Sequence, residues 1–396
     1  MMGLLLIKGG TVAAPQLIGK KDILAAENNI LAIEDEISEA YVRALDPEAE
    51  IINADSCLVV PGLVDGHIHF NGAGGENGPQ FRTPPVQFSS FVKAGITTAV
   101  APLGTDGICR SLRELLAKSR SLDSEGITTF IFTGAYSLPS VTITDNMQTD
   151  IVLIDKIIGT KIALADHRSS HPSVEELRRI ISNTRVAGII AGKAGVVEIH
   201  MGSEKDGLKF ICEAVEGTDV PRTQVIPTHI NRCEELFASS LKYCAEGGIA
   251  DMTTGMGSEA VPVTESVDRI LAAGGDKLLA QYSLSTDGNG SMPVFNEAGD
   301  FVRMGVGDPS LLISSLRDII TQTKADLTQA LSLVTANPAK RLKLFRKGKI
   351  EKNTDADILV LSQDNYSLQY VIAKGKPLMK AGKVVKFGTF ENPENC

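Results

Sequence analysis

Histidines close three predicted strands in this sequence, a pattern that favours a metal site. His67 and His69 end one apolar run, and the two-residue period of a strand puts both imidazoles on the same face. His200 ends the run Val-Val-Glu-Ile-His, and His229 ends Val-Ile-Pro-Thr-His. A lone His-x-His is more often a pair of core histidines, but four imidazoles at three strand ends favour one shared site. Neutral imidazole is a good ligand for zinc.

Two further residues could supply the anions that a pair of metal ions needs. Asp287 follows the last apolar run, in Ser-Thr-Asp-Gly-Asn-Gly, although an aspartate in such a turn often only bonds to its own backbone. Lys161 lies inside an apolar run. Because burial favours the neutral amine, this lysine could add CO2 and become a carbamate that bridges two metals. A lysine whose amine reaches solvent is the commoner case, so both interpretations stay open.

These residues lie in a region where strands and helices alternate. It contains eight apolar, β-branched runs, most of them followed by a helical stretch, at 57–69, 96–102, 127–136, 160–166, 196–202, 224–230, 249–254 and 278–287. Ser173 and Glu176 predict a capping box at the start of one helix, which closes at Gly192. Eight such units fit a closed (β/α)8 TIM-like barrel, with an open doubly wound sheet as the alternative. Polar residues at several strand ends favour the barrel, which gathers those ends around one opening.

Short predicted strands precede and follow this region. They lie at 4–8, 16–20, 29–34 and 50–53 near the start, and at 358–362, 370–373 and 382–387 near the end. Neither end alone can bury a core, so we expect both to complete one small β-sandwich. We therefore predict a discontinuous β-sandwich domain, residues 1–60 with 345–396, and a barrel domain over residues 61–344.

Composition and charge narrow the class of protein. The 396 residues are 43% hydrophobic and 22% charged, which is typical of a globular protein with a large core. The net charge of −9 opposes binding to nucleic acid or to an anionic membrane. The first apolar run is too short for a signal peptide, no run approaches the length of a membrane span, and the six cysteines form no Cys-x-x-Cys pair. We expect a cytoplasmic protein with free thiols.

The combined pattern resembles the binuclear metal-dependent amidohydrolase superfamily. The resemblance rests on Pro-Gly-Leu-Val-Asp-Gly-His-Ile-His at 61–69, on the strand-end residues above, and on the late segments 335–340 and 348–361. It implies a TIM-like barrel that binds two divalent metal ions, and the ligand chemistry favours Zn2+. The ligands that it implies are His67 and His69 for one metal, His200 and His229 for the other, Lys161 as a bridging carbamate, and Asp287 completing the first site.

Within this superfamily, the chain is most similar to the isoaspartyl dipeptidase family. The closer resemblance is carried by segments 74–79, 134–136, 161–169, 228–232 and 285–291. It implies hydrolysis of the isopeptide bond in β-aspartyl dipeptides by a metal-bridging hydroxide. Asp287 would act as the general base and then as the general acid. The family also implies a homo-oligomer, an octamer.

The same resemblance implies how a dipeptide is bound. Tyr136 matches a hydrogen-bond donor to the oxyanion, and Glu76 matches the group that binds the substrate's ammonium. Arg168 and Arg232 match groups that bind its carboxylates, for which a planar guanidinium is suited. We add Thr105 and Ser291, which follow the second and eighth runs, as candidates for further hydrogen bonds to the substrate.

Two other functions stay open on the sequence. A cyclic amidohydrolase, such as a dihydroorotase or a hydantoinase, would use the same metals and base, but its substrate has no α-ammonium for Glu76. A non-catalytic scaffold on the same barrel is a further alternative, which the complete set of ligands disfavours. His167 and His171 are left over, and we assign neither to metal.

Overall fold

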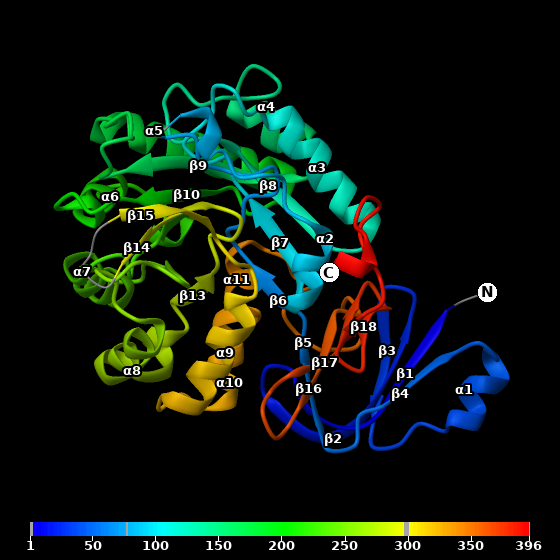
Figure 1. The fold of residues 1–396 in the computed structure, drawn as a ribbon. Helices are drawn as coiled ribbons and strands as arrows, with labels where there is room; N and C mark the ends of the chain where they lie inside the picture. The colour runs from blue at the N-terminus through cyan, green and yellow to red at the C-terminus, as the bar shows by residue number, and fades with distance from the viewer. Residues whose placement is uncertain (1–2, 77, 297–300, 396) are drawn as a thin grey trace.

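The computed structural model describes residues 3–76, 78–296 and 301–395. Asn77 of the segment 74–79 and the last cysteine, Cys396, lie outside the described residues. Figure 1 shows a barrel surrounded by helices, with a second sheet beside it that is built from both ends of the chain. We call this second sheet the terminal sheet. The predicted fold class, a TIM-like barrel with a small β-sandwich, is confirmed.

Within the described residues, eight parallel strands form the barrel in chain order. Every residue of β9 and β10 is buried, as expected for parallel strands that are covered on both faces. Backbone bonds join the segments that follow the last and first strands: Asp287 N donates to His67 O at 3.0 Å, and His69 N donates to Gly288 O at 2.9 Å. The strands are β6 Leu63–Asp65, β7 Ile96–Ala101, β8 Thr128–Gly134, β9 Ile157–Leu164, β10 Val196–Met201, β11 Val225–Thr228, β12 Ala250–Thr253 and β13 Tyr282–Ser285.

Helices cover the outside of the barrel (Figure 1). The predicted capping box is confirmed in α5, where Ser173 and Glu176 each accept from the other's backbone N–H, and the helix ends at Gly192 with φ of 66°. The helices of the barrel are α2 Phe88–Lys93, α3 Leu112–Glu125, α4 Met147–Leu153, α5 Val174–Ala191, α6 Gly207–Val215, α7 Glu234–Ala245, α8 Val263–Leu279, α9 Leu311–Gln322, α10 Leu327–Val334 and α11 Ala336–Arg341, with short 3-10 turns at Pro79–Phe81 and Arg222–Gln224. None of the helices in the described residues is both long and apolar enough to cross a membrane.

The terminal sheet joins the two ends of the chain. β5 pairs with β1 on one side and with β16 on the other, and Ile7, Val59 and Ile358 are among the residues that form its buried core. The elements of this part are β1 Leu4–Ala13, β2 Leu17–Ala26, β3 Asn29–Glu34, α1 Glu39–Leu45, β4 Glu50–Asn53, β5 Cys57–Pro61, β16 Ile358–Ser362, β17 Leu368–Ala373, β18 Lys376–Lys380 and β19 Lys383–Val384, and a 3-10 turn at Pro393–Asn395 follows. The domain limits at residues 60 and 345 stay a prediction.

Three predicted strands differ from the structure. The run 57–69 is split, because β5 joins the terminal sheet and only β6 joins the barrel. The change occurs at Gly62, where a Cβ would collide with the Thr97 side chain. The run 278–287 is shorter than predicted because α8 continues to Leu279. Of the predicted strand 382–387, only the two-residue β19 is present, and β18 lies directly before it. The sequence did not predict the hairpin of β14 Ser291–Phe295 and β15 Phe301–Val306.

Candidate metal and substrate site

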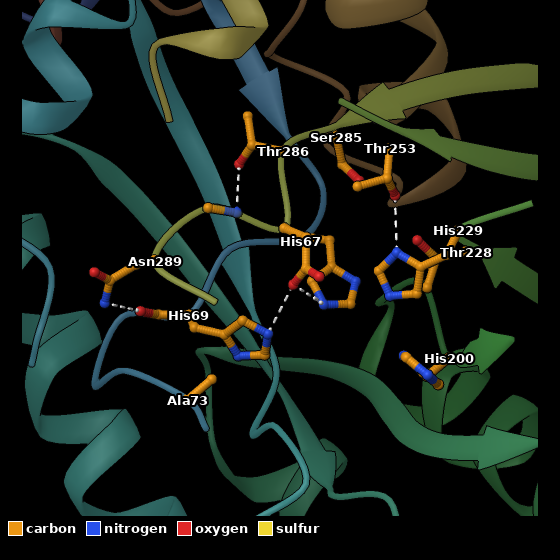
Figure 2. Close-up of polar contacts among 12 residues, drawn as sticks. His67, His69, Ala73, His200, Thr228, His229, Thr253, Ser285, Thr286 and Asn289 are labelled. Atoms are coloured by element: carbon orange, nitrogen blue, oxygen red, sulfur yellow. Dashed lines mark hydrogen bonds and ion pairs between the residues drawn. The ribbon is translucent and has the colours of Figure 1, made fainter. Parts of the chain in front are cut away.

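The histidine cluster lies at the carboxyl ends of the barrel strands, as Figure 2 shows. His67 and His69 follow β6, and their ring centroids are 5.3 Å apart. The ring of His67 is also 5.0 Å from that of His229, which in turn is 4.7 Å from that of His200. The four imidazoles that the sequence analysis selected are therefore brought together, and all four are buried.

Asp287 closes this cluster from the end of the last strand. Its Oδ1 lies 3.0 Å from His69 Nε2 and 3.5 Å from His67 Nε2. Its φ of 49° is in the left-handed region, a strained conformation that is common at functional sites. Burial alone would raise the pKa of this carboxyl, but the hydrogen bond to His69 and the neighbouring imidazoles hold it below its usual value. Asp287 is therefore ionised at neutral pH.

The other two imidazoles are held by different partners. His229, with φ of 64°, has its Nδ1 2.8 Å from the Thr253 hydroxyl (Figure 2). His200 has Nε2 3.0 Å from Asp166 Oδ2 and Nδ1 2.6 Å from the Tyr136 hydroxyl. Burial lowers the pKa of both imidazoles, that of His200 to about 3, so both are neutral near pH 7. A neutral imidazole is the form that binds a metal.

Lys161 lies fully buried inside β9, as predicted, and is joined by a carboxylate that the sequence analysis missed. Glu198 of β10 forms an ion pair with Lys161 Nζ, and its Oε1 lies 2.6 Å from His67 Nδ1. Burial lowers the pKa of the Lys161 amine, although Glu198 opposes this effect. The signal for Glu198 was its position two residues before His200, which places both side chains on the same face of one strand.

The donor set fits a divalent metal ion such as zinc. His67, His229 and Asp287 each offer one ligand atom, and these atoms all lie within 4.8 Å of one another. Within the described residues, His69 Nδ1 is buried with no hydrogen-bond partner. Imidazole nitrogens with one carboxylate are typical ligands of zinc. His200 must exchange one of its present contacts, to Tyr136 or to Asp166, before it can bind a metal.

Charged and polar residues from three loops meet beside His200. The Arg168 guanidinium makes two 2.8 Å contacts with the Asp166 carboxylate, and its Nη1 lies 3.2 Å from Glu76 Oε1. The Thr105 hydroxyl donates to the same Glu76 oxygen at 2.9 Å. Arg168 Nη2 also lies 3.3 Å from His200 Nε2, so this cluster is continuous with the imidazoles. Sequence reasoning missed Asp166 as a site residue.

Tyr136 lies two residues after β8, against the imidazoles. Its ring centroid is 4.5 Å from that of His200 and 5.2 Å from the Arg168 guanidinium carbon. Burial raises the pKa of the phenol, so the hydroxyl keeps its proton and can donate a hydrogen bond.

The remaining residues that the sequence analysis named differ in their distance from this cluster and in their hydrogen bonds. Arg232 Nε and Ser291 Oγ are buried without a hydrogen-bond partner in the described parts of the chain, so both have capacity for a ligand. Ser291 is the first residue of β14, and its side chain lies against Gly74. His167 is exposed, and His171 lies 3.2 Å from the Glu204 carboxylate.

The buried histidines and the carboxylate at the strand ends of this parallel barrel form a donor set that can bind a divalent metal ion. The sequence matches the Amidohydrolase family over residues 58–378, and the chain belongs to this family. Within it, the chain is similar over its whole length to the beta-aspartyl dipeptidase of Fervidobacterium islandicum AW-1, whose crystal structure is a complex with beta-Asp-Leu dipeptide. The identity is 40%, the TM-score is 0.89, and the match covers 98% of this chain and 100% of that one.

More distant relatives act on other substrates. The D-hydantoinase of a Thermus species is 17% identical with a TM-score of 0.71, covers 98% of both chains, and shares the fold. The dihydroorotase of Streptococcus thermophilus CNRZ 1066 is 23% identical over 91% of this chain and 90% of that enzyme. The dihydroorotase of Pelotomaculum thermopropionicum is 39% identical, but over 72 residues, so this chain spans only 16% of that enzyme.

Proposed function

We propose that the protein hydrolyses the isopeptide bond of β-aspartyl dipeptides and uses two divalent metal ions to do so. One observation carries the proposal: Arg168 links Glu76 on one side to His200 on the other. A β-aspartyl dipeptide carries an α-ammonium and two carboxylates around its isopeptide bond. A site for it therefore needs an anion and cations beside the metal ligands, and Glu76 and Arg168 supply both charges. The full-length similarity to a beta-aspartyl dipeptidase supports the same substrate class.

In this proposal, His67, His69, His200, His229 and Asp287 would hold the metals, and Lys161, as a carbamate, would be a further ligand. Two bound Zn2+ ions would lower the pKa of a water molecule and so supply the nucleophile at neutral pH. The carbamate forms when the Lys161 nitrogen adds to the carbon of CO2 and loses one proton. Burial of the amine in β9 supports this step, because it favours the neutral form that can add to CO2.

The chain's own groups then direct the proton and the charge. The Asp287 carboxylate takes the proton of the attacking water as its oxygen bonds to the isopeptide carbonyl carbon. The Tyr136 hydroxyl donates a hydrogen bond to the carbonyl oxygen as negative charge develops on it. When the C–N bond breaks, Asp287 returns the proton to the leaving amino group. Glu76 holds the α-ammonium, and Arg168 and Arg232 hold the carboxylates during these steps.

The test is steady-state hydrolysis of β-Asp-Leu by the purified protein. α-Asp-Leu is the matched control substrate because it contains the same residues in the ordinary linkage. We expect β-Asp-Leu alone to be cleaved, and Glu76→Gln to raise its KM because the neutral amide no longer attracts the ammonium. Glu204→Gln, which removes an exposed carboxylate outside the cluster, should leave KM unchanged.

The second candidate is a cyclic amidohydrolase, which the similarity to dihydroorotases favours. Dihydroorotate and hydantoin are therefore assayed beside the dipeptides. Hydrolysis of either ring at a rate above that of β-Asp-Leu, unaffected by Glu76→Gln, would reject the dipeptidase. The homo-oligomer stays a prediction, which light scattering after size-exclusion chromatography tests.

A further inference from the structure

We propose that Glu198 is a positioning residue of the metal site, which orients the His67 imidazole. The inference rests on the proposed metal site but not on the choice of substrate. Glu198 does not touch the substrate in this proposal. It acts through the His67 imidazole that it contacts.

The strand register places Glu198 in this position. Glu198 of β10 pairs with Lys161 of β9, so two side chains on the same face of neighbouring strands lie side by side. His200 follows two residues later on the same face. The Glu198 side chain is 3% exposed and that of Lys161 is 0% exposed. A carboxylate buried this deeply must be paired, and Lys161 and His67 are its partners.

The contact with His67 determines which of its nitrogens can bind a metal. Glu198 forms an ion pair with the buried Lys161 amine, so its carboxylate accepts hydrogen bonds. His67 Nδ1, which is 2.6 Å from Oε1, is then the ring nitrogen that carries the proton. His67 Nε2 then faces Asp287, 3.5 Å away, as the free ligand atom. A carboxylate behind a ligating histidine is a recurrent arrangement that fixes the ring and its tautomer.

The contact with Lys161 holds Glu198 in place. The other oxygen of Glu198 forms the ion pair with Lys161 Nζ, and this pair keeps Oε1 directed at His67. A cavity of about 20 Å³ borders Glu198, and it is lined by His67, Phe132, Glu198, Asp251 and Arg341 among others. Such a cavity holds about one water molecule.

Two variants separate the two contacts. Glu198→Gln keeps an oxygen that can accept from His67 Nδ1 but removes the charge that pairs with Lys161. Glu198→Ala removes both contacts. Asp46→Asn is the matched control, because Asp46 is also a buried carboxylate but caps the backbone N–H of Leu4 in the terminal part of the chain. The readout is the zinc affinity of the metal-free, full-length proteins, measured by competition with a chromogenic chelator, with circular dichroism as the check on folding.

We expect Glu198→Ala to bind zinc about 10–100-fold more weakly, the usual effect of removing a partner behind a metal ligand. Glu198→Gln should recover part of this loss, and Asp46→Asn should bind zinc as the wild type does. Wild-type zinc affinity in Glu198→Ala, or an equal loss in Asp46→Asn, would overturn the inference. Because no substrate is present, zinc loss in Glu198→Ala would support it even if β-Asp-Leu were not cleaved. A wild-type protein that binds no zinc would overturn both proposals.

A second measurement decides the matter if Glu198→Ala does not fold. Nitrogen-15 NMR of the metal-free wild type reports the tautomer of each histidine, and six histidines make the spectrum tractable. The His67 signals are identified by their absence in His67→Gln. We expect a proton on His67 Nδ1 and none on Nε2. The opposite tautomer would show that Glu198 does not orient the ring.

Discussion

Replacing Tyr136 with phenylalanine removes one hydroxyl group from the centre of the proposed site and leaves its shape intact. The ring stays between His200 and Arg168, whose guanidinium carbon lies 5.2 Å from its centroid, so substrate binding should change little. What is lost is the donor that lies 2.6 Å from His200 Nδ1 and would stabilise the oxyanion. The change should therefore appear in kcat and not in KM.

The size of the effect follows from the two roles of the hydroxyl. Loss of one donor to a developing oxyanion costs about 10²–10³ in kcat, about 2.7–4 kcal/mol. Loss of the hydrogen bond leaves the buried His200 Nδ1 without this partner, which costs about 1–3 kcal/mol of stability. The kinetic effect is therefore separated from the loss of stability by measuring both quantities for each variant.

The assay measures kcat and KM for β-Asp-Leu, with zinc content and a urea unfolding curve for each variant. Tyr243→Phe is the control, because Tyr243 is also buried and bonds to the Arg222 carbonyl oxygen at 3.3 Å, outside the site. It should lose stability only. A fall in kcat of less than tenfold for a fully metal-loaded Tyr136→Phe would refute the assignment of Tyr136 to the oxyanion.

Three further predictions test other parts of the structure. Arg168→Lys should raise KM for β-Asp-Leu by about tenfold or more, because a lysine cannot keep the paired contacts to Asp166 and also reach Glu76. A charged hydrogen bond contributes about 1.5–3 kcal/mol, which is the source of this estimate. An unchanged KM in steady-state kinetics would contradict the prediction. Dialysis against a chelator should abolish hydrolysis, and Zn2+ with bicarbonate should restore it, whereas activity that survives complete metal removal would exclude the proposed chemistry. Lys347→Met should lower the free energy of unfolding by about 3–5 kcal/mol in urea titrations, because it leaves the buried Asp357 carboxylate, 2.6 Å from the amine, without its cation. It also removes the 2.8 Å contact to Asp355, which keeps Arg346 as a partner. Burial alone would lower the pKa of Lys347, but Asp357 and Asp355 raise it above 10.5, so this stabilisation should be complete below that pH and fade as pH rises through the higher folded-state pKa.

The sequence predicted the histidine cluster because each imidazole follows an apolar strand, and a barrel gathers the ends of its strands. It did not predict Glu198, because its contacts depend on the register between β9 and β10 and on the approach of His67 from β6. Such pairings between distant parts of the chain leave no periodic signal. Asp166 was missed for a similar reason, since only the fold shows that it faces both His200 and Arg168.

The division of the run 57–69 shows a related limit. Hydrophobic periodicity identifies a strand but not the sheet that it joins. Val59 and Val64 are both buried and apolar, yet one pairs within the terminal sheet and the other within the barrel. The close approach of Gly62 to Thr97, which separates them, exists only once the barrel has formed.

The pairing of β5 with β16 bears on how this protein is made. Val360, the partner of Val59, is synthesised about 300 residues after it. Until then β5 has an unpaired edge, which is a place where chains aggregate. Pairings of such large sequence separation also form slowly. Nascent chains stalled before β16 should therefore depend on chaperones, even when the barrel strands are already complete.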